Sequence, residues 1–162
     1  MPEMSRSANG VKRFPLIFII SSLVAVADYV TKKIIVSKVM LYESIHVLPF
    51  LNIVHVENKG AAFSILSNMG NTYFIVISFV AICAIILYLS RLQKGLEFYS
   101  LSLILGGAAG NLIDRIRIGK VIDFIDVFVG KWHWPAFNLA DSALTVGIIL
   151  FLMANIRHKK SV

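Results

Sequence analysis

Four long apolar runs dominate this sequence of 162 residues. A helix needs roughly 20 mostly apolar residues to cross a hydrocarbon core of about 30 Å, and runs of that kind cover residues 14–36, 72–90, 96–113 and 135–156. Hydrophobic residues make up 57% of the chain, more than the roughly 45–50% that is usual for soluble domains. We therefore predict an all-α integral membrane protein, one domain over residues 1–162 with four transmembrane helices.

The segments between these runs differ in composition from the runs themselves. Residues 37–70 are rich in β-branched side chains and contain Pro49 and a turn-like Asn58-Lys59-Gly60, which predicts a small hairpin-like sheet outside the lipid. Residues 61–66 are apolar enough to rest on the membrane surface. An even number of spans places both termini on one side, so residues 116–134 are predicted to form a second loop on the same side as the sheet.

The positive charge of the chain is explained by the membrane. Lys and Arg give a net charge of +7, but they gather where the apolar runs end, which is typical of membrane anchoring. We therefore expect membrane lipids and no nucleic acid as partners. Lys32 and Lys33 are predicted to extend to the far interface of the first helix. The charges beside the termini lie in short flanks with few acids, which predicts cytoplasmic termini and extracytoplasmic loops.

Four of the nine acidic residues lie between residues 106 and 141, close to lipid, where an ionised carboxylate is costly. Asp141 is expected roughly 9 Å along a helix that begins at Pro135. Asp123 lies in an apolar segment that must return to the membrane, so it can be delivered beside Asp141. Two carboxyl groups at low dielectric share a proton near neutral pH, which is the requirement for aspartic acid/base catalysis.

Other polar residues fall on the same helix faces. Asn111, Asp114 and Arg115 are spaced i, i+3, i+4, so we expect them to bond to one another, and Asn138 and Asp141 are spaced i, i+3.

Asp28 precedes Lys32 by four residues and is either a simple helix-end ion pair or a support for the site. Asn58, taken alone, is better explained as a turn former. Gly106 and Gly110 are spaced for close helix packing.

Other chemistries fit less well. The four histidines are scattered without a ligand-like spacing, and neither His-Glu-x-x-His nor Gly-x-Ser-x-Gly occurs, so we expect no metal, no cofactor and no serine nucleophile. One alternative is a structural network in which the acids pair with Arg115, Arg117 and Lys120. Another is a small proton-coupled transporter, although we find no inverted repeat.

Five segments in order resemble one known family, the lipoprotein signal peptidases, or signal peptidase II, which are bacterial inner-membrane aspartic proteases. The segments are Asp28-Tyr-Val-Thr-Lys32, Asn58-Lys-Gly-Ala-Ala-Phe63, Gly106-Gly-Ala-Ala-Gly-Asn-Leu-Ile-Asp-Arg115, Val121-Ile-Asp-Phe124 and Phe137-Asn-Leu-Ala-Asp141. Single motifs of this kind are weak evidence, but five in order on a four-span chain are specific.

The resemblance implies a function and a set of site residues. The catalytic pair would be Asp123 and Asp141. The supporting residues would be Asn58, Asn111, Asp114, Arg115 and Asn138, and Asp28 matches the acid of the first motif. The family removes signal peptides from diacylglyceryl-modified prolipoproteins, cutting before the lipid-modified cysteine at the outer face of the cytoplasmic membrane. Its fold, four helices with an extracytoplasmic β-cradle, matches the predicted loops. We expect a monomer.

Overall fold

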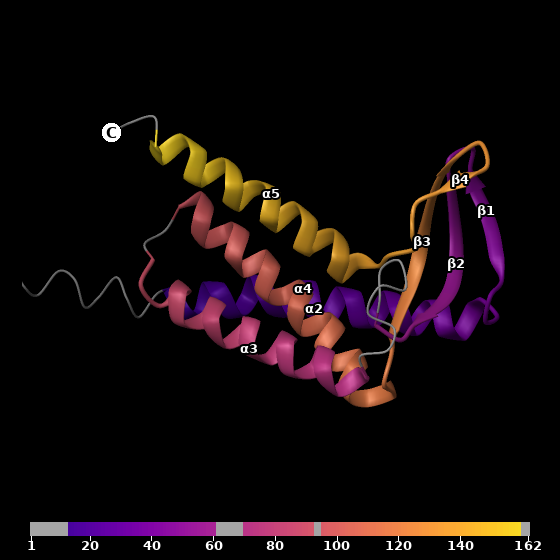
Figure 1. Cartoon of the computed structure of the whole chain (residues 1–162), viewed down its shortest axis with the longest axis horizontal. Coiled ribbons are helices and arrows are strands. Elements are labelled where there is room, and N and C mark those ends of the chain that lie inside the picture. Colours follow the sequence, from indigo (N-terminus) through magenta and orange to yellow (C-terminus); the bar gives the residue numbers. More distant parts are fainter. Residues whose placement is uncertain (1–12, 61–69, 93–94, 160–162) are drawn as a thin grey trace, which may run out of the picture.

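The computed structural model describes residues 13–60, 70–92 and 95–159 (Figure 1). Within these residues, four helices are long and apolar enough to cross a membrane, as predicted. They are α2 (Arg13–Lys38), α3 (Asn71–Leu89), α4 (Leu96–Ile118) and α5 (Leu139–Lys159). The apolar surface segment expected at residues 61–66 lies outside the described residues.

Helix α4 packs against the other three helices. Its glycines allow this close approach, because a Cβ added at Gly106 would lie 2.7 Å from Val24 Cβ and one at Gly107 would lie 2.5 Å from the Ala140 carbonyl oxygen. A cluster of buried apolar side chains fills the bundle, comprising Ile17, Leu89, Phe98, Leu101 and Leu105.

A four-stranded antiparallel sheet lies at one end of the bundle, and the Arg13 end of α2 and the Lys159 end of α5 lie at the other (Figure 1). Its order is β1-β2-β3-β4, with β1 (Ser44–Leu48), β2 (Leu51–Asn58), β3 (Val121–Val129) and β4 (Trp132–His133). The hairpin predicted within residues 37–70 is confirmed as β1 and β2. The expectation that residues 116–134 form a loop was wrong, because β3 pairs along β2 and adds a strand to that hairpin.

Two helix boundaries also differ from the predicted ones. Helix α4 continues past residue 113 to Ile118 and ends at Gly119, whose left-handed backbone (φ 74°) lets its N–H donate to the Arg115 carbonyl. Helix α5 begins at Leu139 rather than near Pro135, because Phe137 is bonded to β3 through the backbone of Ile125. Asp141 therefore lies in the first turn of α5, not a turn and a half inside it.

The sheet is fixed to the bundle by a second apolar cluster. Ile35 and Val39 from the end of α2 pack against Ile122 and Phe124 of β3, and all four are buried. The side chains of β3 alternate between the sheet faces, so this packing fixes the direction in which Asp123 points.

Candidate functional site

Asp123 on β3 is 2% exposed and accepts hydrogen bonds on both carboxylate oxygens. Asn138 Nδ2 donates to its Oδ1 at 2.7 Å, and Asn58 Nδ2 donates to its Oδ2 at 2.9 Å. Asn58 also accepts the Gly60 backbone N–H on its own Oδ1. The two interpretations of Asn58 are therefore compatible, since one amide shapes the turn after β2 and orients Asp123.

Asp141 is held by the start of α5. Its backbone N–H donates to Asn138 Oδ1 at 2.9 Å, and its Oδ2 accepts the Asn138 backbone N–H at 3.3 Å. This reciprocal pattern is a capping box, in which the N-cap residue and the residue three positions later satisfy each other's N–H groups. It explains why the helix starts at Leu139. Asn111 Nδ2 from α4 donates to Asp141 Oδ1 at 2.8 Å.

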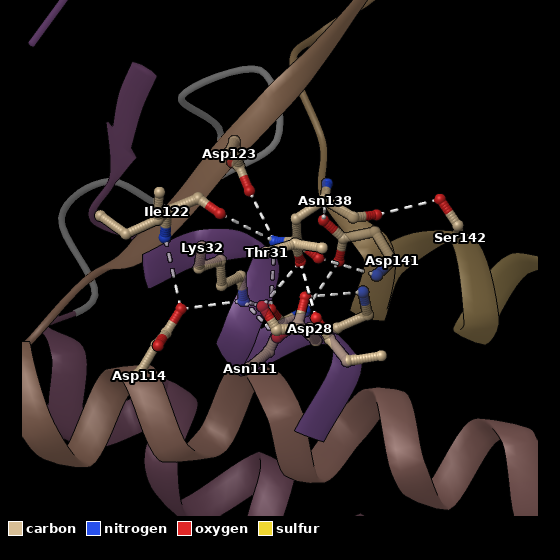
Figure 2. A network of polar contacts seen from close by, with 12 residues as sticks. Asp28, Thr31, Lys32, Asn111, Asp114, Ile122, Asp123, Asn138, Asp141 and Ser142 are labelled. Atoms are coloured by element: carbon tan, nitrogen blue, oxygen red, sulfur yellow. Dashed lines mark hydrogen bonds and ion pairs between the residues drawn. The ribbon is translucent and has the colours of Figure 1, made fainter. Parts of the chain in front are cut away.

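Asn138 joins the two carboxyl groups. It is fully buried, and its Nδ2 lies within hydrogen-bonding distance of Asp123 Oδ1 and of Asn111 Oδ1, at 2.7 and 3.2 Å. Because Asn138 also caps Asp141, the carboxyl groups that were expected to meet are brought into one network through an amide (Figure 2).

Lys32 is buried in the site rather than at the membrane interface where it was predicted. Its side chain is 3% exposed, and its Nζ lies 2.7 Å from Asp28 Oδ2, 2.8 Å from Asp114 Oδ2 and 3.0 Å from Asn111 Oδ1. It therefore does not extend to the interface; of the two lysines, only Lys33 is exposed. A buried ammonium needs such a set of acceptors. The i, i+4 spacing from Asp28 was the sequence signal that could have revealed it.

Asp28 and Asp114 each bond to a backbone N–H group next to the proposed catalytic residues. Asp28 Oδ1 accepts the Ala140 backbone N–H at 2.9 Å, so Asp28 is both the ion-pair partner of Lys32 and a support for the start of α5. Asp114 Oδ2 accepts the Ile122 backbone N–H at 3.4 Å, next to Asp123 on β3.

Arg115 lies close enough to Asp114, Asp123 and Asp141 for their charges to act on it. Its guanidinium carbon is 4.6 Å from the ring centroid of Phe74, a cation–π contact with α3. Its backbone carbonyl accepts Asn71 Nδ2. Asn111 and Asp114 instead bond to Lys32, so the expected triplet on α4 does not form.

The environment of Asp123 changes its acidity. Burial is the main cause that raises its pKa from 3.8 to about 7, and the nearby charge of Asp141 raises it further, against the hydrogen bonds from Asn58 and Asn138. At neutral pH, Asp123 is therefore close to half protonated beside a second carboxyl group. Such a pair can both donate and accept a proton.

The fourth acid of the region, Asp126, lies in a separate network on the sheet. It accepts Asn52 Nδ2 at 2.8 Å and lies 2.9 Å from His133 Nδ1. Among residues 13–60, 70–92 and 95–159, no group of three or more His, Cys, Asp or Glu side chains is placed to hold a metal ion.

Four apolar helices with a buried aspartate–asparagine network beside a small sheet define a multi-pass membrane protein whose polar site lies at one end of the bundle. The family described as signal peptidase (SPase) II matches residues 20–157. A relative named lipoprotein signal peptidase from Syntrophotalea carbinolica is 43% identical over 156 residues, covering 91% of this chain and 97% of that protein. One from Geobacter metallireducens, with the same name, is 46% identical over 147 residues, covering 88% and 91%.

Solved structures agree with these relatives. A bacterial membrane enzyme determined by the in meso method at 2.3 Å resolution is 35% identical, with a TM-score of 0.83 and 91% of each chain covered. A second, at 1.9 Å resolution, is 38% identical, with a TM-score of 0.77 and 86% and 92% covered. The chain belongs to the signal peptidase II family and is thus a peptidase of the membrane.

Proposed function

We propose that this chain is an aspartic endopeptidase that removes the signal peptide from diacylglyceryl-modified prolipoproteins, cutting before the lipid-modified cysteine. Family membership supports the prolipoprotein substrate, since the relatives are named lipoprotein signal peptidases. The observation that carries the aspartic mechanism is the link from Asp123 through Asn138 to Asp141. A buried carboxyl group with a pKa of about 7 beside a second one is suited to acid/base catalysis.

The surroundings of the two carboxyl groups favour different roles. Asp123 is buried and close to half protonated at neutral pH, so we assign it the proton. Asp141 lies in the first turn of α5 and accepts N–H groups from Asn111 and Asn138. These donors hold the oxygens of its carboxylate, so we assign Asp141 the role of the base that accepts a proton from water.

In the proposed reaction, the Asp141 carboxylate takes a proton from water while the water oxygen bonds to the scissile carbonyl carbon. Asp123 donates its proton to the carbonyl oxygen, which gives a tetrahedral intermediate. When the C–N bond breaks, the proton held by Asp141 passes to the leaving amine of the cysteine. The intermediate's hydroxyl returns its proton to Asp123, and a carboxylic acid remains on the signal peptide. No acyl-enzyme forms.

The same proposal places the molecule in the bacterial cytoplasmic membrane as one membrane domain. Both termini face the cytoplasm, and the sheet and site lie at the extracytoplasmic face. This arrangement suits a lipid-bearing substrate, because its acyl chains can stay in the bilayer while the peptide bond reaches the end of the bundle where Asp123 and Asp141 lie. The protein works as a monomer without a cofactor. A proton-coupled transporter, the alternative from sequence, gains no support from the family comparison.

The test is cleavage of a purified diacylglyceryl-modified prolipoprotein by the protein in lipid nanodiscs. Mass spectrometry should find a product that begins with the lipid-modified cysteine, and Asp123→Asn or Asp141→Asn should abolish it. Asp126→Asn is the matched control, because Asp126 is buried on the same strand but belongs to another network. Full activity in either site variant would disprove the aspartate pair. Equal cleavage of the unlipidated substrate would disprove the lipid requirement alone.

A further inference from the structure

A pocket of about 470 Å³ lies between α2, α4 and the β2–β3 part of the sheet. Lys32 and Asp114 line it, whereas Asp123 and Asp141 are not among its lining residues. In Figure 2, Asp114 and Ile122, which line the pocket, lie on one side of Lys32, and Asn138 and Asp141 lie on the other. The proposed cleavage reaction makes no use of this space.

Two cations converge at this pocket on one aromatic ring. Lys33 Nζ lies 5.9 Å and Arg117 Cζ 4.9 Å from the ring centroid of Tyr29, and all three residues line the pocket. Neither cation forms an ion pair with a carboxylate in the described part of the chain. Two positive charges held against the same ring repel each other, and an anion between them would relieve that repulsion.

The other charges of the pocket already have partners. Lys120 is paired with Glu57 at 2.5 Å, and Lys32 is paired with Asp114. The pocket lining therefore has two more cations than acids. This excess favours a ligand with a net negative charge over a zwitterion.

His55 adds a requirement for a hydrogen-bond donor. It is 6% exposed and lines the pocket. Its Nδ1 lies 2.9 Å from the Val39 carbonyl oxygen, which can only accept, so Nδ1 carries the hydrogen. In the neutral ring, Nε2 is then an acceptor, and it is buried without a hydrogen-bond partner among the described residues. A hydroxyl group on the ligand would satisfy it.

Apolar side chains below the pocket indicate that its ligand also has an acyl chain. Val26 precedes Tyr29 by three residues on α2, and Ile113 precedes Arg117 by four residues on α4, so both lie on the pocket side, one turn deeper in the bundle. Both are exposed apolar side chains, at 59% and 37%. An acyl chain below a headgroup in the pocket would cover them.

We propose that this pocket binds the headgroup of an anionic phospholipid that carries a free hydroxyl, such as phosphatidylglycerol, in the leaflet on the sheet side of the membrane. The phosphate lies between Lys33 and Arg117, and a headgroup hydroxyl donates to His55 Nε2. The lipid is a bound component of the protein and is distinct from the substrate.

The experiment measures lipid binding directly. The full-length protein is placed in nanodiscs of phosphatidylcholine with increasing phosphatidylglycerol, and the lipid retained is counted by native mass spectrometry. Lys33→Gln/Arg117→Gln should weaken binding by about 25-fold, about five-fold for each cation lost near a membrane surface. The matched control Lys38→Gln/Lys131→Gln removes the same charge from exposed residues outside the pocket and should bind as wild type does. Arg117→Lys should retain most of the binding.

A second comparison tests the hydroxyl. Wild type should prefer phosphatidylglycerol over phosphatidylmethanol, which has the phosphate but no headgroup hydroxyl, by about five-fold, as expected for one hydrogen bond. His55→Leu should remove this preference.

Several results would overturn the proposal. One is wild-type binding by the Lys33/Arg117 double variant, and another is an equal loss in the control pair, which would indicate general surface charge. Equal retention of phosphatidylethanolamine would contradict anion selectivity. Binding of inorganic phosphate in detergent, at the affinity measured for the lipid, would identify a free-phosphate site. Thermal unfolding in phosphatidylcholine alone checks that each variant folds. If the double variant does not fold, the single variant Arg117→Gln carries the test, with an expected loss of about five-fold.

Discussion

Replacing Lys32 by methionine keeps a long side chain but removes the ammonium group that contacts both Asp28 and Asp114. Both carboxyl groups are almost fully buried, at 1% and 4% exposed, and Nζ lies 2.7 and 2.8 Å from them. Breaking a buried pair by removing one partner costs about 3–5 kcal/mol, because a charge is left without compensation. At about 2–4 °C per kcal/mol for a chain of this size, Tm should fall by about 6–20 °C.

The measurement is thermal unfolding of the purified protein in detergent, followed by the fluorescence of Trp132 and Trp134. Lys33→Met is the matched control, because Lys33 is the next residue on the same helix and is exposed. Its Tm should change by less than about 2 °C, as expected for a surface substitution. Adding Asp114→Asn to Lys32→Met removes one of the stranded charges and should recover a large part of the loss. Equal Tm values for the two lysine variants would refute the buried network.

Three further predictions concern the same region. The pKa of Asp123 is raised from 3.8 to about 7, so its contribution to stability is present below about pH 4 and is lost as the pH rises through 7. Tm should therefore fall as the pH rises over this range, and Asp123→Asn should reduce that fall. Asn138→Ala should cost about 1–2 kcal/mol through the lost cap alone and strongly reduce cleavage, whereas the exposed Asn155→Ala should leave both unchanged. Gly110→Ala should destabilise the bundle by about 1–3 kcal/mol, because the added Cβ would lie 2.8 Å from the side chain of Asp28. Gly70 has open space around it, so Gly70→Ala should not destabilise the bundle. Equal Tm values for the two variants would contradict the tight packing at Gly110.

The bundle was predictable because its signal is long and local. An apolar run of about 20 residues can form few structures other than a membrane-spanning helix. The described helices follow the four runs closely. The hairpin of β1 and β2 was predictable for a similar reason, since both strands and the turn lie within residues 37–70.

The third strand was not predictable in this way. Its partner β2 lies more than 60 residues earlier, and Asn58 pairs with Val121 across that distance. An apolar segment of nine residues with two carboxylates fits a loop, a strand or a membrane re-entry equally well by periodicity. Pairing with the distant β2 and packing against Ile35 and Val39 of α2 together select the strand.

The two mistakes at the helices have a common cause. Pro135 suggested a helix start, but the capping pair of Asn138 and Asp141 is the stronger local signal and fixes the start at Leu139. Lys32 differs from Lys33 by its i, i+4 spacing from Asp28, but this spacing does not tell whether the pair is buried. Which of them turns toward α4 depends on the helix rotation that the glycines of α4 permit, and sequence periodicity alone does not give that rotation.

The spacing of Asp28 and Lys32 affects how this chain enters the membrane during synthesis. Their contact is formed within a single helix, one turn apart, so the first span carries its acid and its base into the bilayer as a self-neutralised unit. Asp114 arrives later, on α4, when Lys32 already has a partner. The contact of Asp28 with the Ala140 N–H needs the start of α5, the helix that also brings Asp141 to the site. The proposed acid/base pair therefore needs the final helix, because Asp141 lies on α5.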